Sequence, residues 1–290
     1  MTASDETTDY RLIDFGNGRK LERFGNRTLD RPCPAAENIS PASPHFWQLA
    51  DARYQKEDGR TGRWHSPSQL APSWQTKFSP FTLQLKLTPF GHVGVFPEQA
   101  ENWDWISRRL QHTDRPLTIL NLFAYTGAST LAAAIAGAQV VHVDGAQNVV
   151  QWARQNAELS GLAKSPIRWI TEDARKFVRR EAQRGNRYDG IILDPPSYGH
   201  GPKGEPWKMA EHFCELLAGC RSLIGQNPQL LLVTCHSPGY DEKRLRDAVG
   251  AAIPELDDAN LAGRPVWLTS DGDQPLPAGF SVRWPEEPRP

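Results

Sequence analysis

The sequence predicts a doubly wound α/β fold, with a seven-stranded and mostly parallel sheet preceded by a small β-rich extension. From about residue 117 onward, short apolar runs typical of buried parallel strands alternate with amphipathic segments of helical length. Residues 1 to about 80 instead carry closely spaced prolines and short strand-like pieces, such as Tyr10–Asp14 before a turn at Gly16–Gly18. We therefore expect two domains, residues 1–80 and residues 81–290.

The regular part is predicted as five strand–helix units and a final pair of strands. Strands are expected at residues 118–123, 140–143, 167–170, 188–193 and 229–234, and helices at 147–160, 174–184, 206–223 and 241–252 and in an alanine-rich segment ending near residue 136. Gly137 and Gly161 follow two of these helices, where a left-handed residue commonly ends a helix. Two last strands, at 266–269 and 280–284, are joined by a hairpin near Pro275–Gly279 that supplies an antiparallel seventh strand. This alternation is typical of a Rossmann-like sheet.

Composition limits the class of protein. With 290 residues, 39% of them hydrophobic, the chain can bury a full core, and no apolar run is long enough to cross a membrane. Its polar, acidic start is unlike a targeting peptide, and four scattered cysteines form no disulfide framework, so we expect a cytoplasmic protein. The histidines lack ligand spacing, so no metal site is expected.

The formal net charge of −1 argues against strong non-specific binding to nucleic acid, but it leaves room for a local basic groove. Arg60 and Arg63 beside Trp64 and His65 are the preferred candidate for an RNA-facing surface. The basic run at residues 175–187 is interpreted first as the solvated face of a helix.

Four polar segments each follow a predicted strand. They are Asn121–Gly127, Asp144, Asp173 and Asp194–Tyr198. Ligands of doubly wound sheets bind outside the carboxyl ends of the strands, where the strand order reverses. We therefore expect these segments to line one site, with Cys235 close by at the end of the fifth strand.

The first three segments are suited to a nucleoside. Gly127 lets the backbone approach a ligand, and the N–H groups that open the next helix favour an anionic group. Asp144 is placed to accept hydrogen bonds from both hydroxyls of a ribose. Asp173 could accept from an adenine amine or cap the next helix, and the two roles are compatible. The loop has one glycine, Gly127, preceded by bulky Phe123 and Tyr125, and so lacks the G-x-G-x-x-G pattern. This disfavours NAD and FAD and favours a nucleoside with an amino-acid tail.

The sharpest single motif is Asp194-Pro-Pro-Ser-Tyr198. Two successive prolines lock an extended backbone directly after a buried strand, which fixes the Asp194 side chain and the Pro195 carbonyl. Tyr198 supplies a flat ring on which a base could stack. The alternative is an ordinary proline-stiffened turn.

Together these segments resemble the class I S-adenosylmethionine (SAM)-dependent methyltransferases, and more narrowly the branch of large-subunit ribosomal RNA methyltransferase I, which methylates cytosine C5. The segment Gly91–Asn102 resembles the lead-in segment of that branch, and the similarity covers roughly residues 80–285. The resemblance implies that SAM is the cofactor. It also implies that the partner is RNA, in particular ribosomal RNA. It implies a cofactor site that includes these residues: Phe96, Gln99, Asn121, Phe123, Tyr125, Thr126, Gly127, Asp144, Asp173, Ala174 and Asp194.

The chain departs from that branch in two places. Residues 1–80 do not look like the RNA-binding module of the related enzymes. The motif of many RNA cytosine-C5 enzymes is Thr-Cys-Ser, whereas this chain has Thr234-Cys235-His236-Ser237.

Three functions remain open at this stage. In the first, the Cys235 thiolate adds to C6 of cytosine, Asp194 contacts N3, and His236 or a helix N-terminus lowers the thiol pKa. In the second, Asp194 and the Pro195 carbonyl orient an exocyclic amine that is methylated without a nucleophile, and Cys235 is a small buried residue. In the third, the chain binds SAM as an assembly or regulatory module with little catalysis. The predicted catalytic set is Cys235, Asp194, Pro195 and Tyr198.

Overall fold

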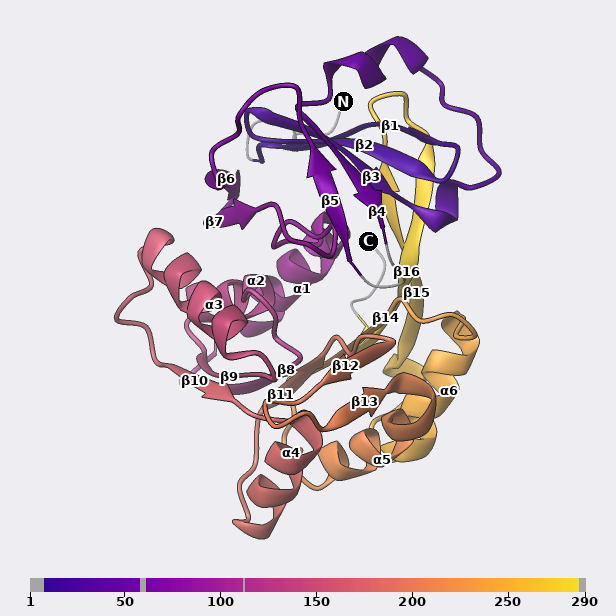
Figure 1. The fold of residues 1–290 in the computed structure, drawn as a ribbon. Helices are drawn as coiled ribbons and strands as arrows, with labels where there is room; N and C mark the ends of the chain where they lie inside the picture. Colours follow the sequence, from indigo (N-terminus) through magenta and orange to yellow (C-terminus); the bar gives the residue numbers. More distant parts are fainter. Residues whose placement is uncertain (1–7, 58–60, 112, 287–290) are drawn as a thin grey trace. The chain divides into compact units, whose positions relative to one another are not determined.

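The computed structural model describes residues 8–57, 61–111 and 113–286, which form two compact units (Figure 1). The first unit comprises the chain up to Glu98 together with Trp267–Ala278, and the second comprises Gln99–Val266 and the chain from Gly279 onward. The predicted boundary after residue 80 differs from this division. Arg60 and the acidic first residues lie outside the described residues.

The first unit is built from β-strands, as predicted for the N-terminal part. One five-stranded sheet runs in the order β1 (Tyr10–Gly16), β2 (Arg19–Phe24), β3 (Arg27–Pro32), β4 (Ala52–Lys56) and β5 (Gly62–His65). Strands β6 (Ser73–Phe78) and β7 (Phe81–Lys86) form a separate hairpin, and the short 3-10 helices η1 (Pro34–Ala36) and η2 (Pro44–Leu49) lie in the loop before β4. The turn between β1 and β2 has Asn17 and Gly18 at positive φ, so the turn predicted there is present.

The second unit contains the predicted seven-stranded sheet. Its strands are β8 (Thr118–Leu122), β9 (Gln139–Asp144), β10 (Ile167–Thr171), β11 (Gly190–Leu193), β14 (Leu230–Cys235), β15 (Ala262–Thr269) and β16 (Pro275–Trp284). Their order is β10-β9-β8-β11-β14-β16-β15. The first five strands pair in parallel and β14 pairs with β16 antiparallel, which confirms the predicted Rossmann-like sheet. The order reverses between β8 and β11, so the loops after these two strands face each other across the switch point.

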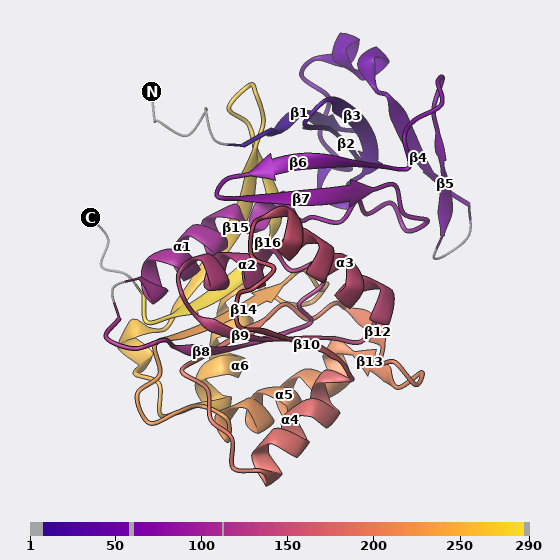
Figure 2. The same cartoon turned by 90° about the vertical axis from the view of Figure 1, so that its left-hand side faces the viewer.

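Helices cover both faces of this sheet (Figure 2). On one face lie α1 (Ala100–Leu110), α2 (Ala128–Ile135) and α3 (Gln147–Leu159), and on the other lie α4 (Ala174–Gln183), α5 (Met209–Arg221) and α6 (Glu242–Ala252). The strand side chains that face α4–α6, among them Leu193 and Val233, pack with Phe177 and Phe213 in one buried cluster. Burial of this face fixes where each strand ends, and therefore where the polar residues that follow it lie.

Three local features differ from what the sequence led us to expect. Helix α1 was not predicted, although Trp103, Ile106 and Leu110 repeat at helical spacing and are buried. The helix expected from residue 206 begins only at Met209, because Pro206–Lys208 is strand β13, which pairs with β12 (Tyr198–His200). The hairpin turn expected near Pro275–Gly279 lies instead at residues 270–274, where the Ser270 amide donates to the Gln274 carbonyl. The prolines that suggested a turn lie in the strand itself.

Candidate active site

The loop after β8 has a backbone conformation that only a well-supported turn can keep. Phe123 and Tyr125 have φ of 54° and 50°, and Gly127 has φ of 95°. A non-glycine residue in this region costs about 1–3 kcal/mol, so the surroundings must hold it. The Asn156 side chain donates to the Thr126 carbonyl at 2.9 Å. A Cβ on Gly127 would lie 3.2 Å from the Cβ of Ala153, so glycine is favoured here both by its dihedral and by space.

Asp144 is fixed by the same loop. Its two carboxylate oxygens accept from the backbone amides of Tyr125 and Ala146, each at 2.9 Å. Burial raises the pKa of the Asp144 carboxyl, and these amides act in the opposite direction. A carboxylate offers about four acceptor positions, and the Gly145 amide also acts on this group, so acceptor capacity remains for a ribose hydroxyl. A pre-organised turn beside such a carboxylate fits the nucleoside and amino-acid parts of SAM.

Asn121 lies on β8, just before this loop. Its amide donates to the Thr130 hydroxyl at 2.9 Å, and the hydroxyl lies 2.9 Å from His142 Nδ1, all three side chains being buried. Burial lowers the pKa of His142 to about 3, so the imidazole is neutral. Asn121 therefore ties β8 to α2, and its predicted contact with the cofactor stays a prediction.

Asp173 caps α4, which confirms one of its two predicted roles. Its side chain accepts from the Lys176 amide at 3.0 Å, and Ala174, the first residue of the helix, is buried. The hairpin β12–β13 covers this position, because a Cβ on Gly201 would lie 3.0 Å from the Cβ of Asp173. The Lys176–Glu205 ion pair links α4 to the same hairpin. The adenine contact of Asp173 stays a prediction.

Asp194 follows β11 and is oriented by a residue that sequence reasoning did not assign. The Thr234 hydroxyl donates to Asp194 Oδ1, because Leu193 and Val233 are register partners and the next residues meet on one face of the sheet. His236 Nε2 lies 3.8 Å from the same oxygen. Among the residues that the structure describes, Oδ2 has no partner, and the carboxylate is partly exposed.

A chain of side chains in turn fixes His236. Gln99 donates to His236 Nε2 at 3.2 Å and accepts from the Asn102 amide at 2.7 Å. Arg283 on β16 donates to Asn102 at 2.8 Å. Gln99 was predicted to contact the cofactor. In the structure it contacts His236, which in turn lies near Asp194. The i, i+3 spacing of Gln99 and Asn102 at the start of an amphipathic helix was the signal that could have found this network.

A residue of strand β13 holds the double-proline segment in place. Trp207 on β13 donates to the Pro196 carbonyl at 2.7 Å and packs against the Phe123 ring at 4.7 Å between centroids. Pro195 is buried, whereas Tyr198 is 46% exposed with its hydroxyl 3.0 Å from His200 Nε2. The segment therefore presents the Asp194 carboxylate and an exposed aromatic ring, as the sequence predicted.

Cys235 ends β14 beside Thr234, but its side chain faces the opposite side of the sheet. The residue is 1% exposed within the same buried cluster as Phe213, and its sulfur accepts from the Ser237 amide at 3.4 Å. Burial raises the pKa of the Cys235 thiol. The prediction that His236 or a helix N-terminus lowers this pKa is therefore wrong, since desolvation dominates.

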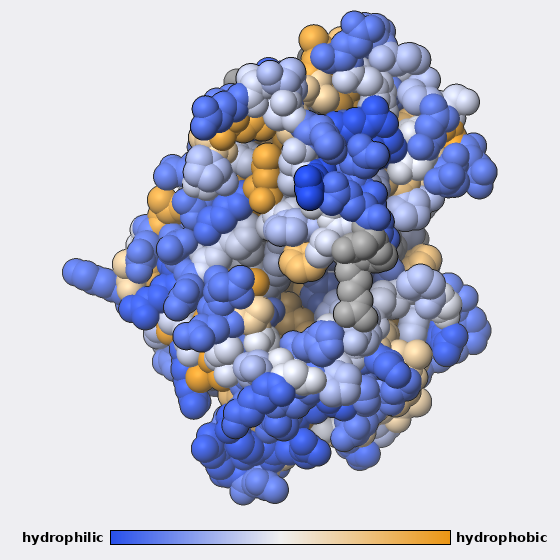
Figure 3. Space-filling model, in the orientation of Figure 1, coloured by the Kyte–Doolittle hydropathy of each residue, from blue (hydrophilic) through white to orange (hydrophobic). Residues whose placement is uncertain are grey.

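The remaining predicted residues lie elsewhere or carry other contacts. Phe96 belongs to the first unit, where its ring lies 5.3 Å from His92, and its closing of the cofactor pocket stays a prediction. Figure 3 shows hydrophilic side chains gathered over α4, where Arg180 and Arg184 pair with glutamates, as expected of a solvated face. In the described part of the chain no cluster of His, Cys, Asp and Glu could hold a metal, and no helix is long and apolar enough to cross a membrane. A cytoplasmic location stays a prediction.

The geometry is that of a doubly wound α/β protein with Asp144 and the proline-stiffened Asp194 at the carboxyl ends of its parallel strands. Residues 26–231 match the family of S-adenosylmethionine-dependent methyltransferases, and the chain belongs to this family. The predicted class and the predicted cofactor, SAM, are thereby confirmed.

Two similar proteins are named as ribosomal RNA methyltransferases. The chain is 34% identical over 82% of its length to "Ribosomal RNA large subunit methyltransferase I" of Aeromonas hydrophila, of which it covers 60%. It is 31% identical over 51% of its length to "Ribosomal RNA large subunit methyltransferase K/L" of Shewanella frigidimarina, of which it covers 20%. The chain thus spans 48–60% of the length of the methyltransferase I proteins from two Aeromonas species that it matches.

A solved structure covers almost the whole chain. The SAM-dependent methyltransferase from Agrobacterium tumefaciens is 37% identical with a TM-score of 0.89, over 96% of this chain and 91% of that one. A Streptococcus mutans protein with 16% identity and a TM-score of 0.74 shares the fold.

Proposed function

We propose that this protein transfers a methyl group from SAM to a base of large-subunit ribosomal RNA, and that Asp194 holds the base. The carrying observation is the Asp194 carboxylate, which Thr234 orients through one oxygen while the other has no partner in the described part of the chain. Such an acceptor suits an amine or a ring N–H of a nucleobase. The RNA substrate is supported by the names of the relatives.

The cofactor supplies an electrophilic methyl group when bound, and the Asp144 carboxylate and the Phe123–Gly127 turn would hold it. At the acceptor, Asp194 fixes the edge of the base, and the rigid Pro195–Pro196 backbone keeps the carboxylate from rotating away. Tyr198 offers its exposed ring for stacking. A SAM-binding module without catalysis would not need the Thr234–Asp194 arrangement, which favours an enzyme.

Cytosine C5 is the first acceptor atom in this proposal. C5 is a weak nucleophile until a thiolate adds to C6; C5 then takes the methyl group, a base removes the C5 proton, and the thiolate leaves with restoration of the double bond. Cys235 follows Thr234 directly on β14, so its backbone is next to that of the residue that orients Asp194, although its side chain faces the other side of the sheet. For this reaction the Cys235 thiol must turn from the core toward the base.

A nitrogen acceptor is the second candidate, and the burial of Cys235 favours it. The 1% exposed residue has a raised thiol pKa, and both properties oppose formation of a thiolate. Asp194 and the Pro195 carbonyl would then orient an amine without covalent catalysis. The two relatives are named methyltransferase I and methyltransferase K/L, so their names do not favour one acceptor atom over the other.

The test uses RNA from a strain that lacks this protein. Nucleoside mass spectrometry is expected to show one modification missing from its large-subunit RNA, which purified protein and SAM restore in vitro. Asp194→Asn is expected to lower kcat at least a hundredfold, because the base loses its fixed carboxylate. Calorimetry with SAM measures separately the predicted contact of Asp194 with the cofactor. If folded protein that binds SAM restores no modified nucleoside to this RNA, the proposal is wrong.

Cys235→Ala separates the two acceptors. With cytosine C5 as acceptor, the variant loses turnover, and wild-type protein becomes covalently trapped on RNA that contains 5-fluorocytosine. Cys214→Ala, which changes an exposed cysteine on α5, is the matched control and is expected to behave as wild type. Full turnover of Cys235→Ala would exclude the thiolate and leave the nitrogen acceptor.

A further inference from the structure

A groove in the first unit combines two arginine side chains with apolar and aromatic walls. It has a volume of about 510 Å³ and lies between the β1–β2 turn, strands β2–β5 and the segment that carries η2. Its lining includes Arg19, Asp30, Arg53 and His65, and Trp47 and three prolines form its walls. The volume is in the range of pockets for single small ligands.

The charged residues are held in one row across the sheet. Asp30 on β3 is the register partner of Arg53 on β4, and Arg53 is the partner of His65 on β5. Asp30 is 3% exposed, and its two oxygens pair with different guanidinium groups, Oδ1 with Arg19 and Oδ2 with Arg53 at 3.3 Å. Arg19 is fixed further by its donation to the Tyr54 carbonyl at 3.0 Å. One buried carboxylate thus orients both arginines.

This arrangement leaves the Arg53 guanidinium largely exposed at the groove. Two guanidinium groups share one carboxylate, and the Arg53 side chain is 62% exposed with only its Nε directed to Asp30. Its terminal N–H groups therefore remain for a ligand, in the fork geometry that suits phosphate. His65, next to Arg53 across β4 and β5, adds a further polar contact.

The walls offer a surface for stacking. Trp47 is half-buried, and its Nε1 donates to Asp14 at 2.8 Å, which fixes the plane of the indole. A fixed aromatic ring beside an arginine is the combination with which proteins bind unstacked nucleotides, since the base stacks and the phosphate pairs with the guanidinium.

We propose that this groove binds one unstacked nucleotide of the RNA substrate, with its phosphate at Arg53 and its base against Trp47. The inference rests on the proposed function, because it names where the first unit holds the RNA. It also gives His65 a place in an RNA-facing surface, whereas Arg63 pairs with Glu57.

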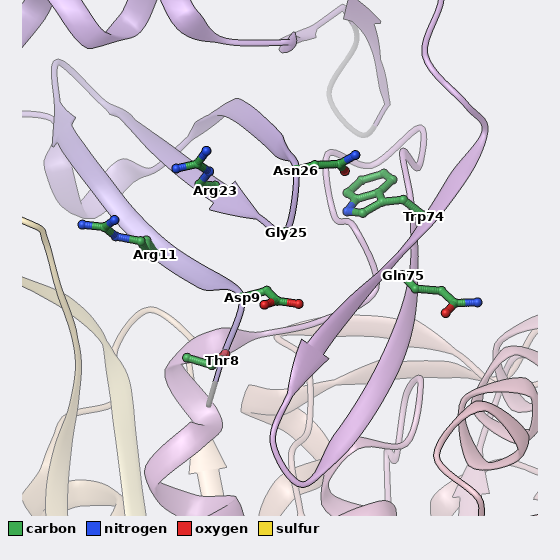
Figure 4. A pocket seen from close by; sticks show the side chains of 8 residues that line it. All are labelled: Thr8, Asp9, Arg11, Arg23, Gly25, Asn26, Trp74 and Gln75. Atoms are coloured by element: carbon green, nitrogen blue, oxygen red, sulfur yellow. The ribbon is translucent and has the colours of Figure 1, made fainter. Parts of the chain in front are cut away.

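A second depression in the same unit has no pair of arginines around one buried carboxylate. It lies at β1, β2 and β6 and is lined by Arg11, Arg23 and Trp74, with Asp9 among them (Figure 4). Arg11 pairs there with Asp271, whose side chain is 36% exposed. Arg23→Gln therefore makes the same change of charge, on an exposed arginine of the same unit, outside the groove.

The experiment measures binding of a fluorescein-labelled, single-stranded oligouridine to the full chain by fluorescence anisotropy. Arg53→Gln is expected to raise Kd about tenfold and to lower the slope of log Kd against log salt by about 0.7, the value for one phosphate contact on a single strand. Trp47→Leu is expected to raise Kd about tenfold through loss of stacking. Arg23→Gln is expected to stay within twofold of wild type, and thermal unfolding checks that each variant is folded.

Methylation kinetics distinguish the failure of this inference from the failure of the proposed function. With large-subunit RNA as substrate, Arg53→Gln is expected to raise KM for RNA while kcat stays within twofold. If wild type methylates this RNA and neither Arg53→Gln nor Trp47→Leu differs from Arg23→Gln, the groove is not an RNA site and the proposed function stands. If oligouridine binding depends on the groove but no ribosomal RNA is methylated, the groove is supported and the proposed substrate is wrong.

Discussion

At the scale of single residues, two carboxylates of the second unit differ in what their surroundings leave available. Asp144 accepts from two backbone amides and keeps lone pairs for a ligand, whereas Asp173 spends one oxygen on capping α4 and is covered by the β12–β13 hairpin. Sequence reasoning assigned both residues to the cofactor. Of the two carboxylates, Asp144 keeps more acceptor capacity, and its contact with the ribose stays a prediction.

Asp144→Asn is expected to weaken SAM binding at least tenfold. One carboxylate oxygen becomes an NH₂ group that faces a backbone N–H, from either Tyr125 or Ala146, so the loop loses a support and the ribose loses an acceptor. Calorimetric titration with SAM measures the effect. Asp247→Asn, at an exposed aspartate of α6, is the matched control and should leave the affinity unchanged. Equal affinities of the two variants would remove the ribose assignment.

At the scale of elements, the strand ends were predictable because their signals are local. A short apolar run followed by a polar residue marks the end of a buried strand, and the parallel topology brings such ends together. Thr234 was missed as the partner of Asp194 because the contact depends on the register of β11 and β14, which no local pattern specifies. The hairpin β12–β13 was missed for a similar reason, since its glycine-rich sequence resembles that of an irregular loop.

The two roles of Asp173 can be separated by comparison with the second helix that begins at a capping aspartate. Asp173 accepts from the Lys176 amide, and Asp241 accepts from the Arg244 amide at the start of α6. Alanine at either position is expected to lower the free energy of unfolding by about 1 kcal/mol, the usual cost of a lost N-cap. Only Asp173→Ala is expected to weaken SAM binding as well, by about threefold to tenfold. Urea unfolding and calorimetry measure the two quantities, and equal SAM affinity in both variants would reduce Asp173 to a cap.

At the scale of the whole molecule, the sheet order was predictable and the division into units was not. Alternation of strands and helices permits few topologies, and the observed order is the one expected for this pattern. The tip of the β15–β16 hairpin, Trp267–Ala278, belongs instead to the first unit. There Leu268 and Leu276 pack with Leu12 and Phe15, more than two hundred residues earlier in the chain. Such a long-range contact leaves no periodic signal in the sequence.

Leu276→Ala is therefore expected to destabilise an element at the opposite end of the chain. Leu276 is fully buried against β1, and truncation of a buried leucine costs about 2–5 kcal/mol because transfer energy is lost and a cavity remains. Hydrogen exchange of the backbone amides of β1 should become faster in proportion. Trp267→Ala removes a larger side chain from the same hairpin, but this residue is 49% exposed, so the cost should stay below about 1 kcal/mol. Unchanged exchange in β1 on Leu276→Ala would mean that the hairpin tip is not part of the core of the first unit, and that this unit is stabilised by the N-terminal chain alone.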